Sequence, residues 1–269
     1  MVRRRLDAEL VRRGLARSRQ DASDLIANGR VTVAGVVAHK PATQVLDSSA
    51  ITLLAPEDVE AERYASRGAL KLLGALKAFA PEGLTVSGRR CLDAGASTGG
   101  FTDVLLREGA REVVAVDVGY GQLAWSLQND PRVVVRDRTN VRTLTLDDTN
   151  GPVELVVADL SFISLRLVLA SLLAVTTPDA DLVLMVKPQF EVGKDRLPSG
   201  GVVRDRALRR EAVLAVATEA AGVGLGVRGV TASPLPGPAG NVEYFLWLHR
   251  DAPPVDVDQV DRAIEEGPP

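Results

Sequence analysis

Four charged residues lie where apolar stretches of the chain begin or end. Asp159 and Lys187 each follow an apolar run, Glu243 directly precedes another, and Lys71 lies on a predicted helix. A charged group at the end of a buried strand must be solvated, paired or functional. Two lysines and two carboxylates around one hydroxyl group are suited to orienting that hydroxyl and removing its proton. The simpler alternatives are lysines whose ammonium groups reach solvent and an aspartate that caps the next helix.

A glycine-rich turn, Leu92–Phe101, follows a predicted strand and opens a predicted helix. A dinucleotide site requires G-x-G-x-x-G, but Ser97 occupies the second glycine position and the charge of Asp93 would oppose a pyrophosphate. A hydrolase elbow, G-x-S-x-G, also matches, and Ser97, Asp159 and His249 follow in the right chain order. However, this turn follows the first strand of the sheet, whereas hydrolases usually have several strands before the elbow.

S-adenosylmethionine fits the same turn better, because it is a cation with an amino-acid head and has no phosphate. Such a ligand favours a carboxylate beside the turn, and Asp93 supplies one. Asp117 and Asp137 end the next two strands, where they would meet the ribose hydroxyls and the adenine amino group. Each of these two acids is equally consistent with capping of the following turn.

The elements that position these residues alternate between strand and helix, which is typical of a parallel sheet covered on both faces. A long helix and two more strands, joined by a Pro/Gly-rich loop, follow and would pair as a hairpin. We therefore predict an α/β fold with a Rossmann-like, seven-stranded methyltransferase domain. The predicted strands are Arg90–Ala94, Val113–Val118, Val133–Asp137, Leu155–Leu160, Leu182–Lys187, Val227–Ala232 and Tyr244–His249.

The first part of the chain predicts a small, separate α+β unit. Residues 4–28 have the spacing of two short helices, the second capped by Ser18, and short strands follow. Residues 1–40 hold nine Lys/Arg and four Asp/Glu, whereas residues 251–269 hold six acids and one arginine. A basic front is suited to phosphates and an acidic tail is not. No aromatic residue precedes Tyr64, which favours structured RNA over flexible single strands.

The composition excludes several other classes. One cysteine, Cys91, allows no internal disulfide, and with two histidines a zinc site is not expected. Three early arginines lack an apolar run behind them, so we expect no signal peptide. The longest apolar stretch, Leu167–Val175, has nine residues, about half of what a membrane span needs. We therefore expect a cytoplasmic protein without a metal or a membrane association.

Six collinear segments resemble the TlyA (hemolysin A-like) family of rRNA 2′-O-ribose methyltransferases. They are Ser66–Leu72, Leu92–Thr102, Asp117–Leu123, Asp159–Ser164, Val186–Glu191 and Gly240–Tyr244. The resemblance covers nearly the whole chain. It implies an S4-type RNA-binding domain at residues 1–60, a linker at 61–66, an FtsJ-like methyltransferase domain at 67–252 and an acidic tail at 253–269 with a short helix.

The resemblance also implies roles for individual residues. The catalytic set would be Lys71, Asp159, Lys187 and Glu243. The methyl donor, S-adenosyl-L-methionine, would lie on Asp93, Ala94, Gly95, Ser97, Gly99, Phe101, Asp117, Val118 and Asp137. RNA would meet Arg4, Arg5, Arg17, Arg19, Arg30 and Lys40. The implied targets are cytidine riboses of 16S rRNA, 23S rRNA or both in ribosomal subunits, and no protein partner is implied.

Two other functions remain open at this point. A pure RNA-binding or ribosome-assembly factor would keep the fold but not the reaction; the complete charged set argues against it. A membrane-lysing protein is suggested by the hemolysin name of the family. No secretion signal, spanning segment or amphipathic membrane stripe supports that function.

Overall fold

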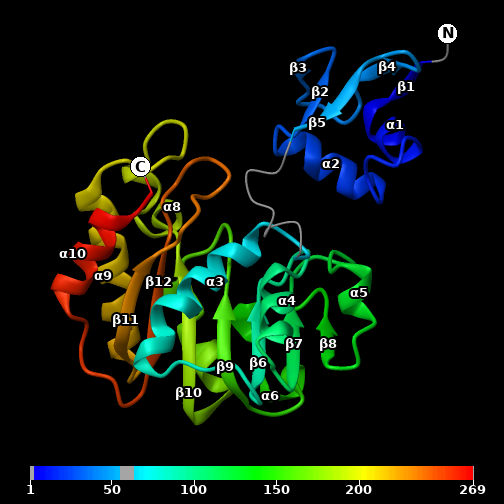
Figure 1. Cartoon of the computed structure of the whole chain (residues 1–269). Coiled ribbons are helices and arrows are strands. Elements are labelled where there is room, and N and C mark those ends of the chain that lie inside the picture. The colour runs from blue at the N-terminus through cyan, green and yellow to red at the C-terminus, as the bar shows by residue number, and fades with distance from the viewer. Residues whose placement is uncertain (1–2, 55–63, 269) are drawn as a thin grey trace. The chain divides into compact units, whose positions relative to one another are not determined.

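A computed structural model describes residues 3–54 and 64–268 of the chain. It divides into two compact units, Met1–Val59 and Glu60–Pro269 (Figure 1). Residues 61–63 of the predicted linker lie outside the described residues. Within the described ranges no helix is long and apolar enough to cross a membrane.

The first unit is a small α+β domain with one core. Its elements are β1 (Arg3–Arg5), α1 (Leu6–Arg12), α2 (Arg19–Ala27), β2 (Val31–Val33), β3 (Val36–Val37), β4 (Gln44–Leu46) and β5 (Ile51–Leu53). The Ser18 side chain accepts a hydrogen bond from the amide of Asp21 at 3.1 Å, so the predicted helix cap is confirmed. Fully buried Leu6, Leu10 and Ile26 bring the two helices onto the short strands.

The second unit is an α/β domain. Its strands are β6 (Arg90–Ala94), β7 (Glu112–Val116), β8 (Val133–Arg136), β9 (Val153–Ala158), β10 (Thr176–Val186), β11 (Gly226–Ala232) and β12 (Tyr244–His249). Its helices are α3 (Gly68–Phe79), α4 (Gly100–Arg107), α5 (Trp125–Gln128), α6 (Leu146–Thr149), α7 (Leu169–Ala174), α8 (Pro188–Glu191), α9 (Arg206–Gly222) and α10 (Val257–Glu266). The predicted strands are thus confirmed, with ends that shift by at most two residues, except that β10 begins six residues before its predicted start.

The strands of this unit form one seven-stranded sheet in the order β11-β12-β10-β9-β6-β7-β8. Strands β6 to β10 pair in parallel, and β12 pairs antiparallel with β10 on one side and β11 on the other. The predicted antiparallel pair is therefore confirmed. Because β12 enters the sheet in the opposite direction, its first residues lie beside the last residues of β10.

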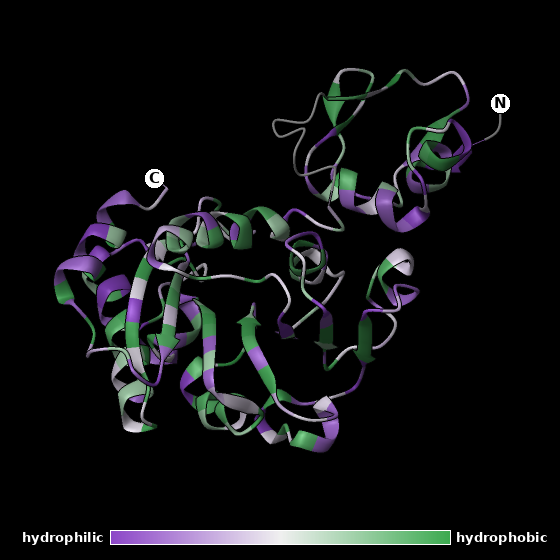
Figure 2. Cartoon of the chain, turned by 60° about the horizontal axis from the view of Figure 1, so that its bottom comes forward, coloured by the Kyte–Doolittle hydropathy of each residue, from purple (hydrophilic) through white to green (hydrophobic). Residues whose placement is uncertain are grey.

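Alternation along the strands builds a separate core on each face of the sheet. Cys91, Leu155, Val157, Phe245 and Trp247 face α3, α4 and α5. The intervening strand residues face α7, α9 and α10 on the other side. The strands are mainly coloured as hydrophobic in Figure 2, while the outer helices carry hydrophilic residues. Cys91 is fully buried and unpaired, and burial raises the pKa of its thiol to about 12.

The acidic tail contributes to the second core. Helix α10 begins after Asp256, whose side chain accepts from the amide of Asp258, and it buries Val260, Ala263 and Ile264 against the sheet and α9. Arg210 of α9 also pairs with Asp261 at 2.5 Å. The tail is therefore packed against the rest of the second unit through its apolar stripe, with its acids on the outer face.

Candidate active site and its relatives

The ends of four strands and the start of a fifth meet at one edge of the large sheet, hereafter the carboxyl edge. In the sheet register, Ala94 of β6 lies beside Ala158 of β9 on one side and Val116 of β7 on the other. Val186 of β10 lies beside Tyr244 of β12. The residues that directly follow or precede these positions therefore lie side by side. The sheet brings together Asp159, Lys187 and Glu243, as the apolar runs predict.

Two lysine–carboxylate pairs occupy this edge. Lys71 of α3 donates to Glu243 across 2.6 Å, and both side chains are almost fully buried. Lys187 lies 2.5 Å from Oδ1 of Asp159 and donates to the Ser161 hydroxyl at 3.0 Å. The Asp159 side chain is the most accessible of the four, with 24% of its surface exposed. The Lys187–Asp159 pair is therefore the more accessible of the two.

Such an arrangement is suited to removing a proton from a neutral hydroxyl. A buried ammonium is costly unless it is paired, and each lysine here has one carboxylate partner. The carboxylates hold the two amines in fixed positions. The site can thus orient a hydroxyl and accept its proton.

The glycine-rich turn borders the same edge. Gly95 has φ 88°, and a Cβ there would lie 2.7 Å from the carbonyl oxygen of Asp159. Ser97 also adopts a left-handed conformation, with φ 46°, which is uncommon for a residue other than glycine. Its amide donates to Asp117 at 2.9 Å, which holds the turn in that conformation. The turn is therefore packed directly against the residue that carries the substrate-accessible carboxylate.

Asp93, beneath the turn, has one carboxylate oxygen without a partner. Its side chain is fully buried, Oδ2 accepts from the Thr102 hydroxyl at 2.6 Å, and Oδ1 has no hydrogen-bond partner among the described residues. Burial raises the pKa of Asp93 to about 7, the nearby acids Asp159 and Asp117 add to the rise, and the Thr102 hydroxyl opposes it. A buried acceptor of this kind fits a positively charged donor group such as an ammonium.

Asp117 and Asp137 order the loops that follow their strands. Asp117 accepts from the amides of Ser97 and Gly119, and Asp137 accepts from the amide of Gly121 at 2.9 Å. The capping role is thus present, and each carboxylate oxygen keeps a lone pair for a ligand hydroxyl or amino group. Both sequence-level interpretations of these acids are compatible with the geometry.

The remaining residues assigned to the donor differ in what they offer. Val118 is 70% exposed, so its side chain is open to a ligand. Ala94 is fully buried in one core, and Phe101 stacks on Phe245 in the other with ring centroids 6.2 Å apart. These two side chains face the cores, so only their backbone groups are available to a donor. Gly99 lies between Ala94 and Phe101 in the chain and has φ 97°. Because it has no side chain, Leu123 and Leu127 can pack closely against it.

The hydrolase alternative is wrong. His249 ends β12, which runs antiparallel to β10, and Leu182 at the opposite end of the sheet pairs with Leu248. Ser97 lies at the carboxyl edge, so His249 and Ser97 are at opposite ends of the strands. The Nδ1 atom of His249 is within 3.1 Å of Arg228 and accepts from the amide of Asp251. The right order along the chain therefore does not produce a triad in space.

Comparisons with known proteins assign both units. The S4 domain family matches residues 4–51 and the FtsJ-like methyltransferase family matches residues 64–250. A relative from Mycobacterium tuberculosis H37Rv, named 16S/23S rRNA (cytidine-2′-O)-methyltransferase TlyA, is 60% identical over the full length of both chains. The chain belongs to the TlyA family.

Two further relatives carry a hemolysin name. Hemolysin A of Brachyspira hyodysenteriae is 36% identical, over 90% of this chain and 98% of its own. The solved structure of a hemolysin-named protein from Streptococcus thermophilus is 36% identical, covers 99% of this chain and 97% of its own, and superposes with a TM-score of 0.74. The chain therefore shares its fold with this solved protein.

The S4 unit of this TlyA-family chain pairs several of the predicted RNA-binding arginines with its own acids. Arg5 and Arg19 contact Asp7 at 2.9 and 3.1 Å. Arg4 pairs with Asp47, and Arg17 lies 3.7 Å from Asp21. Arg5 lowers the pKa of Asp7 to about 2 against the opposing effect of burial, and Arg19 adds to the lowering.

Two predicted RNA contacts differ from these. Arg30 donates to the carbonyl oxygen of Leu54 at 3.2 Å, and Lys40 is exposed. The prediction also omitted Arg12 and Arg13, which both bond to the fully buried Glu9. Arg12 lowers the pKa of Glu9 to about 2, with burial opposing and Arg13 assisting.

The sequence prediction also missed residues beside the catalytic set. Phe162 is 91% exposed with φ 64°, and its ring lies 5.3 Å from that of Phe190. Ser161 bonds to Lys187, and Glu191 bonds to the segment that follows Phe162. All four lie within the motifs that carry the TlyA resemblance, so the signal was present, but no local pattern distinguishes them.

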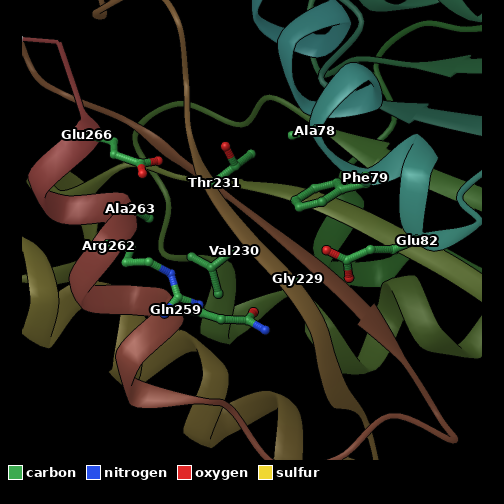
Figure 3. Close-up of a pocket in the computed structure, with 10 residues that line it drawn as sticks. All are labelled: Ala78, Phe79, Glu82, Gly229, Val230, Thr231, Gln259, Arg262, Ala263 and Glu266. Carbon is green, nitrogen blue, oxygen red and sulfur yellow. The ribbon is translucent and has the colours of Figure 1, made fainter.

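A pocket of about 200 Å³ lies elsewhere in the second unit, between the end of α3, strand β11 and helix α10 (Figure 3). Phe79 forms part of its wall, and Glu82 and Glu266 flank it. None of the predicted catalytic or donor-binding residues lines it. This pocket is therefore separate from the carboxyl edge.

Proposed function

We propose that this protein transfers a methyl group from S-adenosylmethionine to the ribose 2′-hydroxyl of cytidine in ribosomal RNA. One observation carries the proposal: two buried lysine–carboxylate pairs lie at the same sheet edge as a buried carboxylate with a free oxygen. The names of the TlyA relatives support both the reaction and the substrate. The proposal places the enzyme in the cytoplasm, where its RNA is made.

The donor end of the site would be formed by acids and backbone groups. The free Oδ1 of Asp93 would accept from the donor's ammonium group, either directly or through an ordered water. Asp117 and Asp137 would accept from the adenosine while their other lone pairs hold the loop amides. The bound donor supplies an electron-poor methyl group on a sulfonium. Gly95 keeps the turn free of a side chain where the backbone of Asp159 comes close.

The lysine pairs would activate the hydroxyl. Neutral Lys187 accepts the proton of the 2′-hydroxyl while the hydroxyl oxygen takes the methyl group. Asp159 fixes the position of the Lys187 amine and balances the ammonium that results. Lys71, held by Glu243, supplies a second positive charge behind the first pair and orients the hydroxyl oxygen. The reaction then needs no further group to carry the proton before product release.

RNA recognition would be divided between the two units. The S4 domain would contact phosphates with the guanidinium groups that its acids hold in place. At the carboxyl edge, exposed Phe162 beside Phe190 offers an aromatic face on which an unstacked base can lie. A ribose hydroxyl in a folded RNA reaches a buried lysine only when its nucleotide leaves the helix, so an aromatic face there is useful.

The test is methyl transfer in vitro. Purified protein is incubated with tritium-labelled S-adenosylmethionine and with ribosomal subunits from cells that lack the enzyme, beside a Lys187→Ala variant. We expect label in rRNA as an alkali-resistant 2′-O-methyl nucleotide with the wild type only. The subunit that takes up label identifies the target. If the wild type binds the donor tightly but labels neither subunit nor naked rRNA, the ribosomal assignment is wrong.

A further inference from the structure

We infer that Glu191 is a positioning residue that locks the loop carrying Asp159 onto the short helix that begins after Lys187. The inference deepens the proposed function and rests on it for its effect on turnover. The loop comprises residues 159–166, hereafter the 159–166 loop, and the helix is α8. Glu191 itself touches neither the reacting hydroxyl nor the donor.

The carboxylate of Glu191 is buried, and within residues 3–54 and 64–268 its hydrogen bonds all come from this loop. Its side chain is 1% exposed. It accepts from the Ser164 hydroxyl at 2.5 Å, from the Leu165 amide at 2.7 Å and from Arg166 at 3.3 Å. Arg166 also donates to the backbone carbonyl oxygen of Glu191 at 3.3 Å. A buried carboxylate with this many donors is well satisfied, and removing it leaves the Leu165 amide without a partner.

The loop and the helix meet at three successive places. At the start of α8, Lys187 contacts Asp159 and Ser161. In the middle, the ring of Phe190 packs on the ring of Phe162. At the end of α8, Glu191 accepts hydrogen bonds from Ser164, Leu165 and Arg166 at the far end of the loop. The first contact is the catalytic pair of Lys187 and Asp159 itself. The last contact, at Glu191, therefore determines whether the loop can move away from that pair.

The loop also needs an external restraint. Phe162 is held at φ 64° with its ring almost fully exposed, and a bulky residue is strained in that conformation. Ser164 caps the short 3₁₀ turn that follows, accepting from the amide of Arg166 at 3.3 Å. The bonds of Glu191 hold Ser164 and Leu165, which are the residues just after the strained position. They therefore stabilise the loop where it is weakest.

The helix has its own attachment to the core and does not depend on Glu191. Val192, directly after α8, packs in a small apolar cluster with Val203 and with Ala212 of α9. Loss of the Glu191 carboxylate should therefore free the loop while leaving Lys187 and α8 in place. The predicted result is a misplaced Asp159 and Phe162 in a folded protein.

The experiment compares Glu191→Ala, Glu191→Gln and Ser164→Ala with a matched control, Glu211→Ala. Glu211 is also a glutamate paired with an arginine, Arg196, but both are exposed on the surface. For each variant we would measure kcat and KM for RNA, the donor Kd by calorimetry, Tm, and hydrogen exchange of a peptide spanning residues 160–168. The exchange measurement is independent of turnover.

For Glu191→Ala we expect kcat to fall by about 10–100-fold, because small misplacements of reacting groups have effects of that size. The donor Kd should stay within about twofold, because none of its ligands moves, and exchange in 160–168 should rise about tenfold or more. Gln keeps an acceptor for Leu165 and an amide group that Ser164 can meet, so Glu191→Gln should restore most of kcat. Ser164→Ala should lie between the two, and its effect should not add to that of Glu191→Ala.

Two results would overturn the inference. One is a Glu191→Ala variant with wild-type turnover or with the same exchange in residues 160–168 as Glu211→Ala. The other is a loss of donor affinity and turnover together, which would indicate a general structural role. If Glu191→Ala does not fold, Ser164→Ala decides by the same criteria, and Glu191→Gln should still stay close to the wild type. If the wild type itself transfers no methyl group, the proposed function fails, while the exchange measurement still decides whether Glu191 locks the loop.

Discussion

Basic side chains pair with carboxylates in both units, but the two regions differ in whether the cation is buried. At the carboxyl edge the lysines are buried, with 10% and 9% of the side-chain surface of Lys71 and Lys187 exposed, and Glu243 is buried with them. In the S4 unit the acids Asp7 and Glu9 are buried, whereas Arg5, Arg12 and Arg19 remain about half exposed. The first arrangement removes the cation from water, and the second presents it to water.

This difference separates two uses of the same contact. A buried amine that is paired with a carboxylate is held in a fixed position inside the site, where it can orient a hydroxyl group. A guanidinium held from behind by a buried acid keeps other N–H groups free for a phosphate and loses less rotamer freedom on binding. A net charge counted as Lys and Arg minus Asp and Glu therefore underestimates the capacity of the S4 unit to bind phosphates, since its acids hold its cations in place.

The largest effect that can test this comparison is at Lys187. Lys187→Arg keeps the charge but supplies a group that does not give up its proton. We expect methyl transfer to fall by about a thousandfold or more, as for loss of a general base, with unchanged donor affinity. The same change at Lys71, for which we propose a role through charge and orientation, should cost less. Single-turnover labelling measures both, and equal losses at the two positions would contradict the division of roles.

Asp93 gives the next largest effect. Asp93→Asn removes a charged acceptor, so donor affinity should fall by about 10–100-fold, the range of a charge-assisted hydrogen bond. Because a buried carboxylate with a raised pKa opposes folding where it is ionised, Tm at pH 8 should not fall. In the wild type, donor affinity should weaken as the pH drops below about 7, where Asp93 takes up a proton. Calorimetry at pH 6 and 7.5 checks this, and a pH-independent affinity would exclude Asp93 as the ammonium partner.

Acid should act on the S4 unit through its buried carboxylates. The pKa values of Asp7 and Glu9 are lowered to about 2 from ordinary values of 3.8 and 4.5. A lowered pKa contributes stability that is present above the ordinary value and is lost as the pH falls toward the folded value. We therefore expect hydrogen exchange in residues 3–54 to rise between about pH 4.5 and 2. In an Asp7→Asn, Glu9→Gln double variant this acid-induced rise should be absent.

The smallest expected effect is at Lys40, an exposed lysine in the S4 unit. Lys40→Ala should weaken rRNA binding only about threefold and reduce the salt dependence by about one counterion, without a change in Tm. Lys77→Ala, which removes an exposed lysine at the end of α3, is the matched control. Filter binding at several salt concentrations measures the slope. An equal effect of both variants would mean that net charge, and not the S4 surface, governs RNA binding.

Much of the site was predictable because apolar runs show where strands end. Asp159 and Lys187 follow such runs, and a parallel sheet necessarily brings their ends to one edge. The S4 strand β1 was missed because Arg3–Arg5 has no apolar pattern; it forms by pairing with β4, almost 40 residues further on. Glu191 was missed because its partners lie more than 20 residues earlier in the chain. His249 was misleading because chain order says nothing about strand direction.

The position of β12 has a consequence for the timing of activity during protein synthesis. This strand is the last of the sheet in the chain, yet it inserts between β10 and β11. Glu243 directly precedes its first residue. The turn with Asp93 and the pair of Lys187 with Asp159 are encoded earlier and precede it on the ribosome. A nascent chain would therefore assemble the turn with Asp93 before Lys71 finds its partner, and an activity that needs the Lys71–Glu243 pair would begin only once β12 has left the exit tunnel.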